Sequence, residues 1–178
     1  MPKGGGSTLP IIVRAAPRAR SRAILQFGPL RLQAAIGRSG ITAIKREGDG
    51  ATPRATMKFI SSYLRGDRIR GIATALPIRR LTKAMLWCDA PAHPAYNRPV
   101  RAPFAASHED LMRDDHLYDI CLVMDWNISS RRRGCGSAIF LHLARSGYRS
   151  TEGCIAVSAR DMRKIVAFLT KDTRITVL

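Results

Sequence analysis

Short runs of alternating or continuously apolar residues, separated by turn-forming residues, make up most of the chain. Alternation with a period of two is typical of strands with one buried face, and short apolar runs are typical of strands within a core. Gly28-Pro29 lies between two such runs and predicts a hairpin turn. The runs, all predicted to be strands, occupy residues 11–13, 23–27, 30–34, 57–64, 136–143, 155–157 and 173–178.

A further run, 116–124, is nearly apolar throughout from Ile120 and predicts a central strand that is covered on both faces. The segment 88–106 differs because it contains Pro91, Pro94, Pro99 and Pro103. Proline lacks the backbone N–H that a sheet ladder needs. We therefore predict an irregular covering loop here, and loops of this length usually carry function.

A single amphipathic helix is predicted near the C-terminus. Ser158 has the form of an N-cap, with Asp161 in the first turn. The apolar positions that follow at helical spacing are Met162, Ile165, Val166 and Leu169. They predict about three turns with an apolar stripe that faces the core.

These elements predict a single, mainly β domain over residues 10–178, sandwich-like or barrel-like, with one clear C-terminal helix. The length of 178 residues is sufficient for one ordinary domain with its own core. Residues 1–9, rich in Gly and Ser, are predicted to form a flexible N-terminus.

The chain is strongly basic, with 30 Lys and Arg against 13 Asp and Glu and a net charge of +17. Such a surface attracts polyanions, of which nucleic acid is the usual one. Aromatic residues make up only 6%, and no zinc-knuckle spacing or helix-turn-helix pattern is apparent, so we expect no specific nucleic-acid recognition. A polyanionic cell-wall polymer fits the same charge.

The sequence has no apolar run of membrane-spanning length, and its first residues lack the apolar stretch of a signal peptide. We therefore expect no membrane span. Three alternatives remain for its location: the protein is cytosolic, it is exported by a signal that precedes this sequence, or it is exported by an unconventional route.

The four cysteines, Cys88, Cys121, Cys135 and Cys154, are scattered without CxxC pairs. This spacing predicts neither a disulfide scaffold nor a zinc site, and we expect no metal and no cofactor.

One cysteine is nevertheless a candidate nucleophile. His142 ends an apolar run, and Cys154 follows Gly153 after a further turn. Neighbouring strands run roughly 5 Å apart, so an imidazole and a thiol can meet and form a thiolate–imidazolium pair. The N–H groups of Gly153 and Cys154 could then hold an oxyanion. His116 and Cys135 form a competing pair, which composition alone does not exclude.

Two short segments resemble a known family. Residues 136–142, GSAIFLH, followed by 151–155, TEGCI, resemble the active-site signature of the YkuD-type L,D-transpeptidase catalytic domain, a strand His followed by a Ser/Thr-x-Gly-Cys turn. Residues 45–53, KREGDGATP, resemble the family's Gly-containing Thr-Pro element, and 96–100 and 115–119 resemble a proteobacterial branch of the family.

The resemblance implies a β-rich sandwich-like domain with a cleft over the cysteine turn. It implies that Cys154 is acylated by a peptidoglycan stem peptide, that His142 is its base, and that the Leu143 carbonyl orients the imidazole. Residues that could contact the substrate are Thr151, Ser137, Arg133, Tyr96, Asn97, His116 and Tyr118.

By resemblance, transfer to a diaminopimelate amine gives a cross-link, either third residue to third or, as in the proteobacterial branch, L-Ala to diaminopimelate. Transfer to water instead gives an L,D-carboxypeptidase. A non-catalytic basic domain that binds polyanions is the third alternative. The family implies a periplasmic, cell-wall-facing location.

Overall fold

A computed structural model describes residues 9–178, so the predicted flexible N-terminus lies outside the described residues except for Leu9. The described chain is mainly β with one α-helix, which confirms the predicted fold class. The strands are β1 (Ile11–Ala16), β2 (Ala19–Phe27), β3 (Leu30–Ala35), β4 (Ile41–Thr42), β5 (Thr52–Pro53), β6 (Thr56–Leu64), β7 (Ile78–Arg80), β8 (Met85–Cys88), β9 (Arg98–Arg101), β10 (His108–Asp110), β11 (Ile120–Met124), β12 (Phe140–Leu143), β13 (Ile155–Val157) and β14 (Arg174–Val177).

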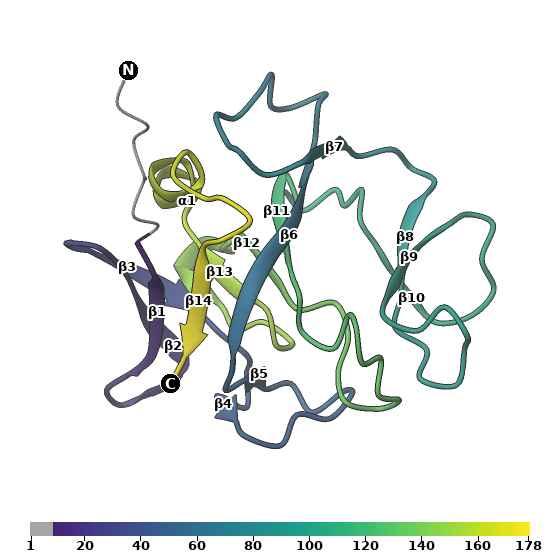
Figure 1. The fold of residues 1–178 in the computed structure, drawn as a ribbon, viewed down its shortest axis with the longest axis horizontal. Helices are drawn as coiled ribbons and strands as arrows, with labels where there is room; N and C mark the ends of the chain where they lie inside the picture. Colours follow the sequence, from purple (N-terminus) through teal and green to yellow (C-terminus); the bar gives the residue numbers. More distant parts are fainter. Residues whose placement is uncertain (1–8) are drawn as a thin grey trace.

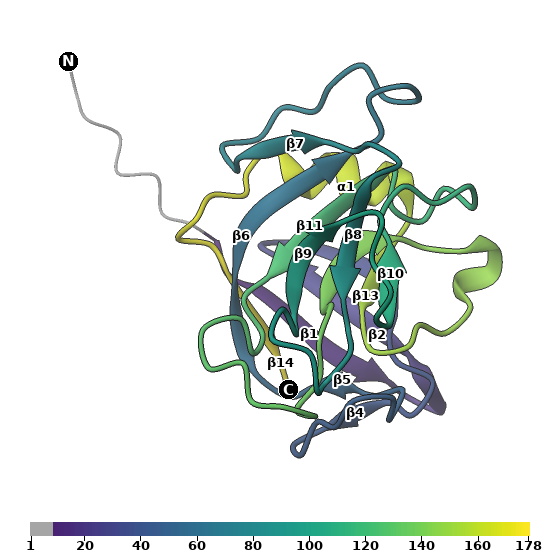
Figure 2. The same cartoon turned by 90° about the vertical axis from the view of Figure 1, so that its right-hand side faces the viewer.

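The largest sheet closes into a barrel (Figures 1 and 2). Its strand order is β11-β12-β13-β3-β2-β1-β14-β6-β7, and an additional pairing of β11 with β6 completes the ring. The pairs β1–β14 and β12–β13 are parallel, whereas β11, β2 and β3 pair antiparallel with their neighbours. Closure removes the free edges of the ring itself, and β7, which pairs with β6 alone, remains an edge strand.

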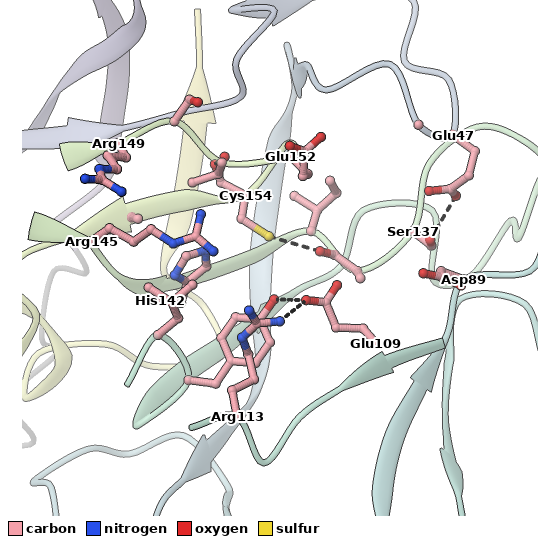
Figure 3. Close-up of a pocket in the computed structure, with 18 of the residues that line it drawn as sticks. Glu47, Asp89, Glu109, Arg113, Ser137, His142, Arg145, Arg149, Glu152 and Cys154 are labelled. Carbon is pink, nitrogen blue, oxygen red and sulfur yellow. Dashed lines mark hydrogen bonds and ion pairs between the residues drawn. The ribbon is translucent and has the colours of Figure 1, made fainter. Parts of the chain in front are cut away.

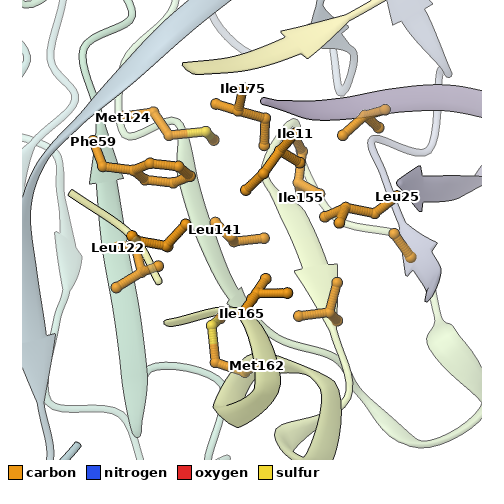
Figure 4. Close-up of a cluster of buried hydrophobic side chains, with 14 of the residues drawn as sticks. Ile11, Leu25, Phe59, Leu122, Met124, Leu141, Ile155, Met162, Ile165 and Ile175 are labelled. Atoms are coloured by element: carbon orange, nitrogen blue, oxygen red, sulfur yellow. The ribbon is translucent and has the colours of Figure 1, made fainter. Parts of the chain in front are cut away.

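Alternate residues of the barrel strands fill its interior (Figure 4). In β2, for example, Leu25 is fully buried while its neighbour Ile24 is 40% exposed. The helix α1 (Ala159–Val166) lies at the upper end of the barrel in Figures 1 and 2 and adds Met162 and Ile165 to this core. The helix therefore covers this end of the apolar interior.

The helix begins as predicted and ends earlier. Ser158 Oγ accepts a hydrogen bond of 3.0 Å from Asp161 N, which confirms the N-cap. The helix ends at Val166. Leu169 lies in the turn that follows, where its N–H donates to the Val166 carbonyl and its side chain is buried in the core. No helix in residues 9–178 has the length and apolar character that a membrane crossing requires.

A second apolar cluster lies outside the barrel, between β11 and β12 and a small sheet of order β10-β8-β9. Strand β11 faces both clusters: Leu122 packs inside, and Cys121 and Val123 pack outside. Burial on both faces explains why this strand is continuously apolar.

Two strands begin later than predicted. The central strand begins only at Ile120, because 116–119 form a turn in which Asp119 N bonds the His116 carbonyl. Strand β12 begins at Phe140, because Gly136 and Ala138 have positive φ values of 91° and 51°, which a strand cannot accommodate.

The predicted covering loop 88–106 is also not wholly irregular, since it contains β9. Pro99 is tolerated there because β9 is an edge strand of the small sheet and needs no N–H donor on its free side.

Candidate active site

The register of two parallel strands brings His142 and Cys154 to one surface. His142 of β12 lies opposite Ala156 of β13, and Cys154 precedes Ala156 by two residues. Side chains two residues apart point to the same face of a strand, so both groups lie on the outer face of the barrel. Both line a cavity of about 360 Å³, shown in Figure 3.

Backbone contacts hold the turn that carries the cysteine. Thr151 N donates to the Ile36 carbonyl at 3.0 Å, and Arg38 N donates to the Thr151 carbonyl at 2.9 Å. Gly153 has φ 142°, and a Cβ at this position would lie 2.9 Å from the Ala51 carbonyl oxygen. A glycine is therefore required, because the segment that leads into Thr52-Pro53 packs directly beneath the turn.

The thiol of Cys154 is buried, with only 9% of the residue exposed. Its Sγ donates to the Ala138 carbonyl at 3.1 Å and accepts from Phe140 N at 3.4 Å. Burial raises its pKa to about 12, and the carboxylate of Glu109 acts in the same direction. The Phe140 N–H opposes this rise because it favours the thiolate.

His142 is oriented by its own strand. Its Nδ1 lies 2.8 Å from the Leu143 carbonyl oxygen, which can only accept, so Nδ1 carries the hydrogen and Nε2 is left as the basic nitrogen. Tyr118 packs edge-on against the ring with centroids 5.2 Å apart. Burial lowers the pKa of the ring to about 4.

Burial therefore favours a neutral thiol beside a neutral imidazole rather than the expected thiolate–imidazolium pair. Both shifts disfavour charge separation because burial penalises the charged form of each group. The arrangement suits proton transfer that accompanies attack on a bound substrate, because the basic Nε2 is already oriented.

Basic and acidic side chains lie on opposite sides of the Cys154 thiol. Figure 3 shows Arg145 and Arg149 on one side of Cys154, and Glu47 and Asp89 on the other. In residues 9–178, no group of three or more His, Cys, Asp or Glu side chains is arranged to hold a metal ion.

Glu109 and Arg113 lie between these two sides, below the thiol in Figure 3. Glu109 accepts from the Tyr118 hydroxyl at 2.7 Å and pairs with Arg113 at 3.3 Å. Arg113 also pairs with Asp115 at 2.6 Å, and its guanidinium lies 5.3 Å from the centre of the Tyr118 ring. These contacts link the carboxylate of Glu109 to the ring that packs on His142.

Some of the predicted substrate contacts line the cavity, namely Ser137, Thr151 and Tyr118. Thr151 Oγ1 donates to the Cys154 carbonyl at 2.6 Å and accepts from Gly153 N at 3.2 Å. One of the two predicted oxyanion donors is thus already engaged within the turn.

The other predicted contacts lie elsewhere. Tyr96 and Asn97 are buried behind the cavity wall, where Asn97 Oδ1 accepts from Ala138 N at 3.1 Å and so supports the segment before β12. Arg133 is exposed and does not line the cavity. His116 has a side chain 70% exposed and lies 2.8 Å from Asp119.

The competing cysteine has different surroundings. Cys135 lines a separate hollow with Trp126 and Ile44, and its carbonyl accepts from Trp126 Nε1 at 3.0 Å. His116 contacts Asp119 and Arg68 instead. All four cysteines are free, as their spacing predicts.

Sequence reasoning did not identify six charged residues of the cavity, Glu47, Asp89, Glu109, Arg113, Arg145 and Arg149. They come from separate segments with no shared motif. The sequence carries a signal for Asp89 alone, because the long proline-rich segment 88–106 is predicted to carry function.

A model of the YkuD family, the L,D-transpeptidase catalytic domain, matches residues 19–177. The chain belongs to the YkuD family. Members are cysteine-dependent L,D-transpeptidases that act on peptidoglycan, which supports an acyltransferase activity for this YkuD domain. The predicted family is confirmed, and its proteobacterial branch stays a prediction.

Among solved structures, that of Bdellovibrio bacteriovorus Bd1075 is similar at 13% sequence identity and a TM-score of 0.49. The match covers 97% of this chain and 48% of that one, so the chain spans about half the length of that protein. A search of curated proteins finds no match.

Proposed function

We propose that this chain is a peptidoglycan L,D-transpeptidase with Cys154 as nucleophile and His142 as general base. The observation that carries the proposal is the shared outer face of β12 and β13, which brings the thiol and the oriented imidazole into one cavity. The family assignment supplies the substrate class, a stem peptide.

In the first step, Cys154 Sγ attacks a stem-peptide carbonyl while His142 Nε2 takes the thiol proton. The C–N bond then breaks, and the imidazolium gives this proton to the departing amine. The product is a thioester on Cys154. Neutral resting forms suit this order because the charges arise only when substrate has excluded water.

The oxyanion of this step would be held by the N–H groups of Gly153 and Cys154. Gly153 N already donates to Thr151 Oγ1, so the oxyanion would replace that hydroxyl as the acceptor. Preorganised donors of this kind contribute roughly 3 to 4 kcal/mol each to transition-state stabilisation.

In the second step an amine of another stem resolves the thioester and forms the cross-link. The bond formed joins either two third residues or L-Ala to diaminopimelate. Water in place of the amine gives a carboxypeptidase from the same acyl-enzyme. The charge of +17 suits work on a polyanionic wall polymer, and we place the domain in the periplasm, facing the wall.

The test is digestion of purified sacculi with the wild type and with Cys154→Ala, followed by mass spectrometry of the muropeptides. New dimers from the wild type alone support transfer, and their fragmentation identifies the linked residues. Trimmed stems without dimers favour the carboxypeptidase, and identical profiles contradict both.

Cys121→Ala is the matched control, because Cys121 is a buried cysteine of the same outer cluster that does not line the cavity. It is expected to keep the wild-type muropeptide profile. The non-catalytic alternative predicts steeply salt-dependent polyanion binding as the sole activity, unchanged in Cys154→Ser.

A further inference from the structure

Three carboxylates line the cavity beside the proposed nucleophile. They come from Glu47 in the loop between β4 and β5, Asp89 after β8, and Glu109 in β10 (Figure 3). The chain has 30 cationic residues for 13 acidic ones, so partners for carboxylates are abundant. Acidic groups that have no cation as partner inside this cavity therefore point to a cationic ligand.

Asp89 is the clearest case. Its Oδ1 has less than 1 Å² of exposed surface and no hydrogen-bond partner among residues 9–178. A buried acceptor without a donor costs free energy, and the cost is larger for a charged group. The Asp89 side chain also lines the cavity, so a ligand with a donor group could satisfy its carboxylate there.

Glu47 is held by neutral donors. Its Oε2 accepts from Ser137 Oγ at 2.8 Å and from the Tyr96 hydroxyl. Lys45, whose side chain also lines the cavity, is paired with Asp49. Within the described part of the chain, no Lys, Arg or His nitrogen lies within 4.0 Å of a carboxylate oxygen of Glu47 or Asp89.

Glu109 is only partly compensated. Its ion pair with Arg113, at 3.3 Å, is longer than the 2.6 Å pair that Arg113 forms with Asp115. The negative wall thus keeps a surplus of charge, while Arg145 and Arg149 line the cavity on the other side of the thiol.

We infer that Glu47, Asp89 and Glu109 form a subsite that binds a primary ammonium group of the substrate. An ammonium is a compact cation with three donors, which suits a cavity wall that carries carboxylates from three segments. A carboxylate of the same substrate can pair with Arg145 and Arg149. The inference rests on the proposed function and assigns these residues to the ammonium group of its diaminopimelate substrate.

The ammonium can belong to the acyl donor or to the acceptor, and two assays distinguish them. The first follows acylation of Cys154 by intact-protein mass spectrometry, with donor peptides whose third-residue side-chain amine is free or acetylated. The second keeps the donor fixed and titrates free diaminopimelate as acceptor. Asp89→Asn and Glu47→Gln are compared with Asp110→Asn, which removes the same charge from an exposed position outside the cavity.

Loss of one charge-assisted contact is expected to raise the half-saturating concentration of the amine-bearing substrate about tenfold or more. A rise for the free-amine donor, absent with the acetylated donor, assigns the subsite to the donor. A rise for diaminopimelate alone assigns it to the acceptor. Asp110→Asn is expected to match the wild type.

Asp89→Asn removes an unpaired buried charge, so its melting temperature is expected to equal or exceed that of the wild type, which verifies that the variant folds. Unchanged half-saturation in both assays, in a variant whose Cys154 is still acylated, overturns the subsite. A wild type that never acylates Cys154 contradicts the proposed function itself, and with it this subsite.

Discussion

The two faces of β12 and β13 serve opposite purposes. Inside the barrel, Leu141 and Ile155 lie in a wholly apolar cluster. On the outer face, one residue away in each strand, His142 and Cys154 line a cavity that also holds charged side chains. The apolar inner face sets the register of the two strands, and this register brings both reactive groups to the cavity on the outer face.

The largest effect is expected on the outer face. Cys154→Ala should lower transfer by at least about 10⁴-fold, because no other thiol lines the cavity in the described residues. The melting temperature should change little. Acyl-enzyme formation is measured by intact mass, and a variant that still accumulates a stem-peptide adduct would contradict the assignment.

His142→Gln should lower the acylation rate about 10²- to 10⁴-fold, since the general base is lost while a hydrogen-bond donor toward the Leu143 carbonyl can be kept. Single-turnover kinetics test this. An acylation rate equal to that of the wild type would remove His142 from the mechanism.

Leu141→Ala, the adjacent residue on the inner face, should lower the free energy of unfolding by about 2 to 5 kcal/mol, because it leaves a cavity in a fully buried site. Denaturant titration measures this change. Acylation per folded molecule should stay close to wild type, and a loss as large as that of His142→Gln would show that the two faces are not separable.

The buried imidazole makes stability depend on pH. Burial lowers its pKa to about 4 from an ordinary 6.5, so below pH 6.5 the unfolded state binds the proton first and stability falls until about pH 4. The loss attributable to this group is about 3 kcal/mol. Between pH 6.5 and 4, the free energy of unfolding should fall more steeply with decreasing pH for the wild type than for His142→Gln. Equal slopes for the two proteins would refute the shift.

The smallest effect is expected at the mouth of the cavity. Glu152 pairs with Arg38, and its side chain is 79% exposed and faces solvent. Glu152→Gln should change the free energy of unfolding by less than about 1 kcal/mol. A loss of several kcal/mol, measured in the same denaturant titration, would mean that this pair supports the cysteine turn.

Much of the fold could be predicted from local pattern. The strand expected at 57–64 corresponds to β6, and the hairpin around Gly28-Pro29 joins β2 to β3. The motifs around His142 and Cys154 resemble the family's active-site signature, and this resemblance led to the family. The boundaries near Gly136 and His116 were missed because backbone angles there depend on contacts made by distant segments, such as the bond from Ala138 N to Asn97.

The sequence by itself determined the β-rich class, the helix cap at Ser158 and the candidate pair His142 and Cys154, because each depends on residues close together in the chain. The tertiary structure alone brings Glu47, Asp89 and Glu109 into the cavity beside the thiol and buries the thiol and the imidazole so that both stay neutral. Both depend on how the closed barrel and the small outer sheet pack, and no local pattern carries that information.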